Sequence, residues 1–539
     1  MKKKYLIAFC MLAAMPAVAQ ETYENANIVT EDLNGTARYV GMGGAMDALG
    51  AEISTISTNP AGLGLFRSSQ ISASAGLSIQ PDAEDFNNAS KAHANFDQIG
   101  FVWNGSGYGN SNINLSFNYH KSRDFNYILS AAQTSLSQRA SQHALSYIKA
   151  VADPDQTGET TIAINQTGHG YAGDFYYTSQ IDNLYYNTFI VDPDGYAWFS
   201  MADGYAMNRA NKGYIGEYDF NISGNINDRV YLGLTVGLHD VHYKGYSEYT
   251  ETFIGGATTG SVTVCDERKI TGTGYSVTLG AIFRPIEESP FRVGLSFASP
   301  TFYDLTTSNY TYLVNKTNCQ AANPNYTTGD SYDFRLNSPM KFGVSLGHTV
   351  ANCLALGAVW EYADYGATNP RVKDDDYYDW YYDTYYSSST RDRVMKDHTE
   401  KTLKGVSTLK LGVEYKPVPQ VALRAGYNYV SPMYNTDGFK DAYLDSYATN
   451  VASATDYTNW KSTNRLTLGA GYTYGKFFAD LAWQYTAQKG DFRPFMDAYA
   501  DEFVKKDGTI VVEPIDNYAT KTKVENNRHQ VLLTLGYRF

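Results

Sequence analysis

Two histidines three residues apart, His239 and His242, are the closest pair of histidines in the sequence. Imidazole nitrogens bind zinc and other transition metals, but a protein site needs three or four ligands. No further ligand is evident at a spacing typical of a metal or haem site. The sequence therefore predicts neither a metal nor another cofactor.

A second group of candidate side chains is the run DDDYYDWYYDTYY at residues 374–386, where carboxylates alternate with aromatic rings. Carboxylates bind hard cations, but this spacing matches no calcium-binding loop. The rings could instead hold a sugar or an apolar ligand, and the simplest interpretation is a solvated loop. Because no nucleophile and base stand together, we expect no enzyme activity.

The first nineteen residues have the three parts of a secretory signal peptide. Lysines occupy positions 2–4, an apolar run covers residues 5–15, and Ala17-Val18-Ala19 precedes the cleavage site. An exported chain with so few cysteines does not use disulfides as its scaffold. Cys265 and Cys319 lie on consecutive long loops, and the sequence leaves open whether they form a disulfide.

The net charge is −13 at pH 7, and loss of the signal lysines makes the chain more acidic. Such a chain repels phosphate, which argues against nucleic acid as a partner. The chain also contains 47 Tyr, 46 Gly and 25 Phe, which are high counts for a soluble enzyme. This composition favours a fold that places aromatic rings outside a soluble core.

The elements that would carry these residues are β-strands. In the last residues, RHQVLLTLGYRF at 528–539, apolar side chains alternate with polar or small ones. Successive side chains of a strand point to opposite faces, so one face is apolar and the other polar. The same alternation gives candidate strands that begin near residues 70, 97, 113, 124, 217, 229, 268, 291, 338, 352, 402, 419, 462, 477 and 528.

Short and long connections alternate between these strands. The long ones cover roughly residues 135–216, 244–267, 303–330, 365–401, 432–461 and 489–527. This sorting is typical of outer-membrane barrels and not of a soluble β-sandwich. An even strand number is usual, so we predict an all-β, antiparallel transmembrane barrel of about fourteen strands, with one surplus candidate among residues 97–134.

A barrel of this size has a lumen too wide for wall side chains to fill, so it holds water or a plug. Residues 20–68 are the candidate plug, since TARYVGMGGAMDALG at 36–50 is rich in small residues. Asn59 could cap a short helix that starts at Pro60. A periplasmic leader or an ordinary turn is the alternative. The inward charges are expected to line the lumen or hold the plug: Arg292, Arg424, Arg465, Glu414 and Asp480.

The segment ARYVGMGGAMDALGAEISTISTNPAGL at 37–63 resembles the N-terminal hatch of the FadL/TodX family of outer-membrane transporters for long-chain fatty acids and other hydrophobic compounds. The family's Asn-Pro-Ala motif matches Asn59, Pro60 and Ala61. Its preceding small-residue segment matches Gly41, Gly43, Gly44 and Ala45. The resemblance implies a hatch-closed barrel with an apolar ligand pocket. The ligand would leave through the periplasmic end or sideways into lipid.

The sequence thus predicts a signal peptide at residues 1–19, a hatch at 20–68 and a barrel with long extracellular loops at 69–539. We expect a monomer in the outer membrane that takes up small, fatty-acid-like molecules passively. The hatch residues above and Gly62 would form the gate, and Phe539 would be the signal for barrel-assembly machinery. A secretion or surface-complex accessory, an adhesin and an open porin are the alternatives.

Overall fold

A computed structural model describes residues 21–539 except for short internal gaps. The gaps are residues 107–109, 137–138, 152–162, 165–169, 172–178, 191–197, 255, 320–323, 352, 375–376, 382–383, 445, 447–448, 450, 501–502, 505–509 and 513. The predicted signal peptide lies outside the described residues. So do Asp375, Asp376 and Asp383 of the acidic-aromatic run.

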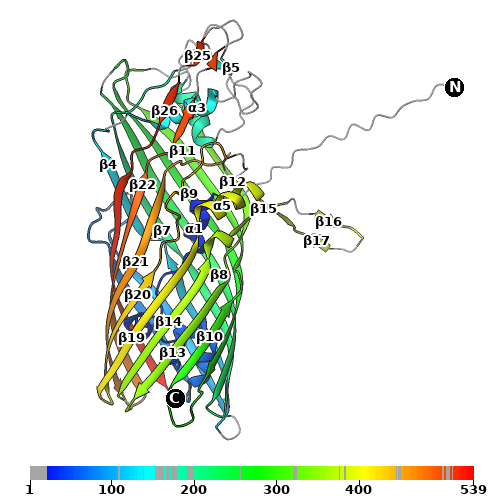
Figure 1. Cartoon of the computed structure of the whole chain (residues 1–539), viewed down its shortest axis with the longest axis vertical. Coiled ribbons are helices and arrows are strands. Elements are labelled where there is room, and N and C mark those ends of the chain that lie inside the picture. The colour runs from blue at the N-terminus through cyan, green and yellow to red at the C-terminus, as the bar shows by residue number, and fades with distance from the viewer. Residues whose placement is uncertain are drawn as a thin grey trace, which may run out of the picture.

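Within the described residues, fourteen antiparallel strands form a closed barrel, as predicted (Figure 1). The ring closes where the last wall strand, Thr522–Arg538, pairs with the first, Gln70–Ile79. On its other side the last wall strand pairs with Phe477–Arg493. In chain order the wall strands are β1 (Gln70–Ile79), β2 (Ala92–Ser106), β3 (Asn112–Asp124), β7 (Gly204–Ile226), β8 (Val230–Phe253), β9 (Gly260–Phe283), β10 (Arg292–Ala298), β13 (Lys341–Val350), β14 (Leu354–Asp364), β19 (Gly405–Val418), β20 (Val421–Val430), β21 (Tyr457–Tyr474), β22 (Phe477–Arg493) and β27 (Thr522–Arg538).

The surplus candidate strand is β4 (Tyr127–Gln133), which pairs with β7 beyond the end of β3. β3 and β4 therefore pair with successive parts of β7 and count as one strand of the wall. The predicted loop at 303–330 is wrong in part, because β11 (Phe302–Asn315) and β12 (Thr327–Asn337) form a hairpin there. β11 also pairs with β9, so the sheet continues past the predicted loop boundary.

Two further loop predictions are too long for the same reason. β8 runs to Phe253 and β9 starts at Gly260, which leaves little of the predicted loop at 244–267. β7 starts at Gly204, inside the predicted loop at 135–216. The outward faces of these strand ends carry polar side chains such as Thr250, Thr252 and Thr263, so the apolar outer face that marks membrane-facing strands is absent from them.

The two faces of the wall differ as the alternation predicts. On β27, Leu533 and Leu535 are 47% and 58% exposed, whereas Thr534 between them is fully buried in the lumen. The same contrast recurs on β10, β13, β19, β20 and β21, whose outward leucines, valines and aromatics are exposed. A continuous apolar outer band is typical of barrels whose outer surface contacts lipid.

Short turns lie at the end of the barrel where the C-terminus lies, and long connections lie at the other end (Figure 1). None of the helices in the described part of the chain is long and apolar enough to cross a membrane. The long connections contain α3 (Gln142–Val151), β5 (Ala163–Ile164), β6 (Gly170–Tyr171), α4 (Gln180–Tyr185), η3 (Tyr186–Ile190), η4 (Tyr365–Ala367), β15 (Asn369–Lys373), β16 (Tyr377–Asp379), β17 (Thr384–Tyr386), β18 (Ser389–Arg391), α5 (Arg393–Thr402), β23 (Ala498–Ala500), β24 (Phe503–Val504), β25 (Ile510–Val512) and β26 (Ile515–Asn517).

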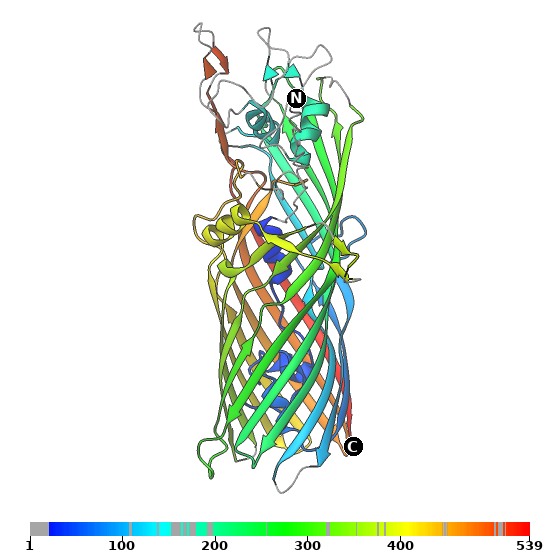
Figure 2. The same ribbon diagram turned by 90° about the vertical axis from the view of Figure 1, so that its right-hand side faces the viewer.

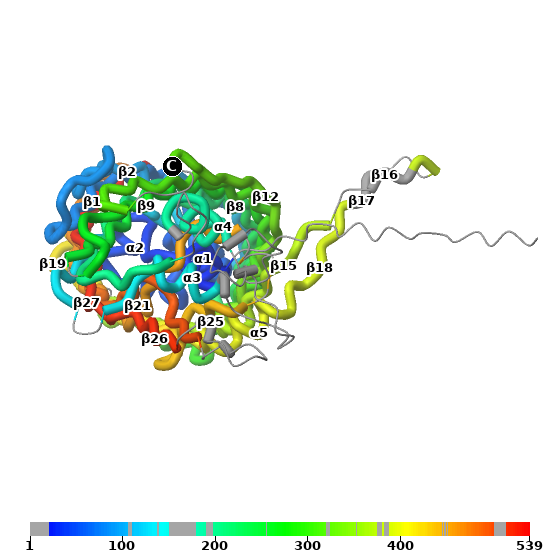
Figure 3. Tube along the Cα trace, turned by 90° about the horizontal axis from the view of Figure 1, so that it is seen from above, coloured from blue at the N-terminus to red at the C-terminus, as the bar shows by residue number. Residues whose placement is uncertain are grey.

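The N-terminal segment lies inside the ring of strands, where Figure 2 and Figure 3 show its blue helices. We call residues 21–66 the plug. It contains α1 (Thr22–Val29), α2 (Ala37–Gly41), η1 (Ile53–Ile56) and η2 (Pro60–Leu65). Its buried apolar side chains form small clusters, most of them shared with wall residues such as Val102, Tyr231 and Leu532. The plug therefore depends on the barrel for most of its core.

Candidate functional site

The eight consecutive wall strands from β8 to β21 each place a glycine on the inner face where the plug passes. A Cβ atom at seven of these glycines would lie under 3.0 Å from a plug atom, and at the eighth 3.3 Å from Gly41 Cα. Only glycine lets two backbones approach so closely. The wall glycines are Gly233 (β8), Gly280 (β9), Gly294 (β10), Gly347 (β13), Gly357 (β14), Gly412 (β19), Gly426 (β20) and Gly469 (β21).

Four of the wall glycines form an unbroken row across neighbouring strands. Gly347 is opposite Gly357, Gly357 is opposite Gly412, and Gly412 is opposite Gly426. The plug backbone from Met42 to Ala48 runs over this row. The backbone at these four glycines forms a docking surface for the plug, and its shape depends on the absence of side chains there.

The Asn-Pro-Ala motif docks on another arc of the same wall. Asn59 caps η2 as predicted, since its side chain accepts a hydrogen bond of 3.3 Å from the Ala61 backbone nitrogen. The Asn59 amide lies over Gly280 and Gly294, and Pro60 lies over Gly233. Because Pro60 begins the helix, its missing N–H costs no hydrogen bond. The turn thus fixes the Asn59 side chain against β9 and β10.

The predicted plug glycines lie in two places. Gly41 meets Gly469 on β21, and a Cβ at Gly43 would lie 2.9 Å from the Tyr427 nitrogen on β20. Gly43 has φ of +63°, a conformation that favours glycine. Gly44 packs inside the plug against Leu33, and Gly62 packs against Thr55. The structure therefore brings Gly41 and Gly43 to the backbone of the wall, whereas Gly44 meets only the Lys410 side chain of β19 and Gly62 stays within the plug.

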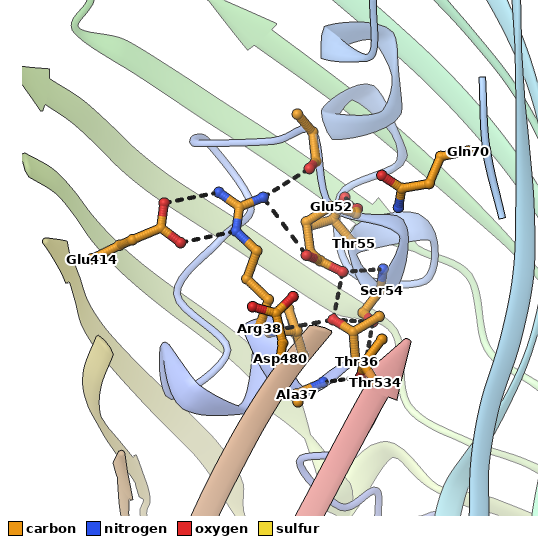
Figure 4. A network of polar contacts seen from close by, with 12 residues as sticks. Thr36, Ala37, Arg38, Glu52, Ser54, Thr55, Gln70, Glu414, Asp480 and Thr534 are labelled. Atoms are coloured by element: carbon orange, nitrogen blue, oxygen red, sulfur yellow. Dashed lines mark hydrogen bonds and ion pairs between the residues drawn. The ribbon is translucent and has the colours of Figure 1, made fainter. Parts of the chain in front are cut away.

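A buried ion network joins the plug to the wall (Figure 4). Arg38 of α2 donates to both oxygens of Glu414 on β19, with Nε at 3.0 Å and Nη2 at 3.2 Å. Glu414 also accepts from Arg424 Nε at 2.6 Å, and Arg424 Nη1 lies 2.6 Å from Asp480. Bidentate pairs of this kind are strong and directional.

The same arginine holds the plug together. Arg38 Nη1 donates to the Ala51 carbonyl at 2.9 Å and lies 3.8 Å from Glu52. Glu52 accepts a hydrogen bond of 2.6 Å from Thr36. Burial raises the pKa of Glu52, and Arg38 and Thr36 oppose that shift. Arg38 therefore couples the internal fold of the plug to its docking on the wall.

The other inward charges also face the plug. Arg292 donates to the Leu49 carbonyl at 3.0 Å, and Arg465 lies 3.6 Å from Asp32. Asp32 in addition pairs with Arg123 at 3.2 Å. Two further ion pairs between plug and wall join Glu31 to Lys341 and Glu24 to Arg268, and Glu21 pairs with Lys440 in the β20–β21 connection.

A cavity of about 400 Å³ separates part of the plug from the wall. Along β8 and β9 its lining reaches Tyr246 and Asp266. The charged side chains of the lining are largely paired with one another, as in Arg209–Asp456 at 2.6 Å. Between the pairs lie aromatic rings: Tyr23, Phe125, Tyr243, Tyr365, Tyr434, Tyr457 and Trp460. The lining is thus mixed, not the apolar pocket that the family resemblance implies.

A cluster of apolar side chains lies at the barrel end opposite the short turns. Helices α3 and α4 contribute Leu145, Ile148 and Leu184, and they pack on Phe253 of β8 and Phe492 of β22. The plug lies on the side of this cluster that faces the short turns (Figure 2).

No family model matches the chain, and no curated protein is similar to it. Among solved structures it is similar to a Pseudomonas aeruginosa FadL homologue, with 12% identity over 95% of this chain and 99% of that chain and a TM-score of 0.48. It is also similar to the Ralstonia pickettii toluene transporter TbuX, with 12% identity over 94% and 99% of the chains and a TM-score of 0.47. A third similar structure is the CymD monoaromatic hydrocarbon channel, with 10% identity over 95% and 99% and a TM-score of 0.48.

His239 and His242 are not brought together. They are three residues apart on β8, so their side chains point to opposite faces of the wall. His239 is buried in the lumen, whereas His242 is exposed and lies 2.9 Å from Asp240. In the acidic-aromatic run, Asp374 accepts hydrogen bonds from Ser388 and Thr390, which is typical of a loop contact.

Cys265 and Cys319 are both free thiols in the structure, so the disulfide that the sequence left open is absent. Cys265 lies on β9 opposite Tyr312 and Glu248. Cys319 contacts Thr258, seven residues before Cys265. At about 3.3 Å per residue, the two thiols are roughly 20 Å apart along the sheet.

Several site residues were not predicted. The wall glycines are visible in the sequence as glycines on the polar face of successive strands, but their alignment depends on strand register. Arg38 carries no signal beyond its charge. Phe539 directly follows β27, and its backbone nitrogen donates a hydrogen bond of 3.0 Å to the Ser69 carbonyl.

Asp47 gives plug docking a pH dependence. It is buried in the plug, accepts a hydrogen bond of 2.7 Å from Thr58, and faces the Lys410–Glu361 pair of the wall. Burial raises the pKa of Asp47 from 3.8 to about 6, and Lys410 opposes this shift. The docked plug therefore prefers the protonated acid, so this contribution is complete below pH 3.8 and is lost as pH rises through about 6.

We expect the plug to be more accessible at pH 8 than at pH 5, by about 1.4 kcal/mol in docking free energy, because pH 5 lies only one unit below the pKa of about 6 in the docked state. Limited proteolysis of the reconstituted protein, scored at sites within residues 21–66, measures this difference. The Asp47→Asn variant should show a smaller pH difference, while Glu52 retains a contribution of the same sign. Equal pH dependence in the parent and the variant would contradict the assignment.

Proposed function

We propose that the chain is an outer-membrane channel for passive uptake of small hydrophobic molecules that carry a polar group. Residues 20–68 would act as its gate. The observation that carries the proposal is the plug itself, which lies in the lumen and is docked on the wall glycines by its backbone. An open porin fits less well, because the plug occupies the path of water.

The cavity lining supports the choice of solute. Its charges are neutralised in pairs, and aromatic rings lie between them, so an apolar body can pack on ring faces while phenol hydroxyls bind a polar group. Its volume lies within the usual range of small-molecule pockets. Release into lipid avoids returning the solute's methylene groups to water, at about 0.8 kcal/mol each.

Liposomes that contain the purified protein test this proposal. We expect slow uptake of a labelled medium-chain fatty acid and little steady ion conductance from the parent. The double variant Asn59→Ala/Pro60→Ala loosens the docked turn, so uptake and ion conductance should both rise severalfold. Pro419→Ala, in the exposed β19–β20 turn, is the control and should behave as the parent.

Two outcomes count against the proposal. Steady ion conductance by the parent would favour an open porin. Lack of fatty-acid uptake by the parent and the double variant alike would favour an accessory or adhesin role for the same barrel.

A further inference from the structure

Two histidines and two carboxylates meet on the inner wall next to the plug. His120 (β3) is directly opposite Glu217 (β7), and Glu217 is directly opposite His239 (β8). Directly opposite residues share a face of the sheet, so the three side chains form a row in the lumen. Asp219, two residues along β7, lies on the same face. All four are more than nine-tenths buried.

The donor atoms of this cluster are close to one another. His120 Nε2 lies 3.6 Å from Glu217 Oε2, and His120 Nδ1 lies 3.3 Å from Asp219 Oδ2. Ligand atoms of these three residues all lie within 4.8 Å of one another. His239 Nδ1 is 3.8 Å from Glu217 Oε2. Bonds of about 2 Å to one metal ion need only small side-chain rotations from this arrangement.

Three polar atoms of the cluster have no hydrogen-bond partner among the described residues. They are the two carboxylate oxygens of Asp219, of which Oδ2 has only the ion pair with His120, and His239 Nδ1. His239 Nε2 lies 2.9 Å from Ser276 Oγ, and a proton on Nε2 leaves Nδ1 with a lone pair directed at the Glu217 carboxylate. Buried lone pairs and carboxylates that face one another are costly unless a cation lies between them.

Gly237 leaves room for such a cation. It is opposite Asp219 in the sheet. A Cβ atom at Gly237 would lie 3.2 Å from both Asp219 Oδ1 and Glu217 Oε1, and 3.0 Å from Ser276 Oγ. No side chain from Gly237 enters this space. The nearby Lys341 is paired with Glu31 of the plug, so it does not neutralise both wall carboxylates.

We propose that His120, Glu217, Asp219 and His239 bind one divalent transition-metal ion, with zinc as the best match. Two imidazoles and two carboxylates supply four ligands, and nitrogen ligands disfavour calcium and magnesium. The contact between His239 and Ser276 is the kind of outer hydrogen bond that fixes the tautomer of a metal-binding histidine. The site lines the cavity beside the plug and is independent of the transport proposal.

Zinc titration of the purified, EDTA-stripped protein in detergent tests the site. We expect one zinc ion per chain by calorimetry, and at least tenfold weaker binding in Asp219→Asn and in His239→Gln. His242→Gln is the matched control, because it removes an exposed histidine from the same strand and should bind zinc as the parent does. Heat-modifiable migration on gels reports whether each variant has a folded barrel.

Cobalt(II) provides a readout on the parent alone, should a variant fail to fold. A four-ligand site of nitrogen and oxygen gives cobalt(II) intense visible absorption, which zinc then abolishes by displacement. Absence of zinc binding and of this absorption in the parent would overturn the proposal and leave the cluster as a buried ion-pair network with a protonated His120. Unchanged zinc binding in both folded variants would overturn it as well.

Discussion

Arg38→Met should weaken the docking of the plug on the wall. Arg38 binds Glu414 through two hydrogen bonds and also holds Ala51 and Glu52, so the change breaks a buried plug–wall ion pair. Breaking such a pair costs about 3 kcal/mol or more, and the low end applies because Glu414 keeps Arg424. At 1.4 kcal/mol per factor of ten, the undocked population rises roughly a hundredfold.

Single-channel recording in planar bilayers measures this effect as the fraction of time that ions are conducted. Arg229→Met is the matched control, because Arg229 pairs with Glu287 in an exposed turn. Exposed pairs contribute little to stability, so this variant should conduct as the parent does. Arg38→Lys keeps the charge but not the two parallel hydrogen bonds to Glu414. The fraction of time that it conducts ions should therefore lie between those of the parent and Arg38→Met. Parent-like closure of Arg38→Met would show that the network does not hold the plug.

Gly357→Ala should displace the plug by a different route. A Cβ atom at Gly357 would overlap the Ala45 carbonyl oxygen, which is backbone and has no flexible end to move away. Inserting one methyl group into a tight contact costs typically about 1–3 kcal/mol. The expected result is ion conductance and faster proteolysis of residues 21–66, in a barrel that is otherwise folded.

Gly224→Ala is the control for this variant. On β7, Gly224 shares the outward face with the exposed Ile222 and Ile226. The nearest atom to a Cβ added at Gly224 would be the backbone oxygen of Asn112, at 3.8 Å. The same chemical change is therefore made on the outer face with room to spare. If both variants leave the plug closed, the wall glycines do not set the fit of the plug.

The sequence was sufficient for the class of fold because lipid-facing strands carry their signal locally. The alternation of side chains, as at residues 528–539, indicates which face of a strand contacts lipid. The length of each connection indicates at which end of the barrel that connection lies. The signal fails where the wall extends beyond the apolar band. The hairpin at 302–337 and the upper parts of β8 and β9 have polar residues on the outward face, so they were predicted as loops.

The capped Asn59-Pro60 turn was also predictable, because a cap and the following helix are neighbours in the chain. The surfaces that receive the turn were not predictable. Gly280 and Gly294 contact Asn59 only because strand register places the two glycines side by side. Arg38 and Glu414, which form an ion pair, are 376 residues apart in the sequence.

The sequence by itself determined a β-barrel, an inward and an outward face, and a small-residue segment suited to fill the lumen. Only the tertiary structure decided which wall atoms meet that segment, that His120 and not His242 neighbours Glu217 and His239, and that the cavity is lined by paired charges and rings. The physical reason is that side-chain alternation repeats within one strand, whereas contacts across the lumen depend on the register of all the strands together.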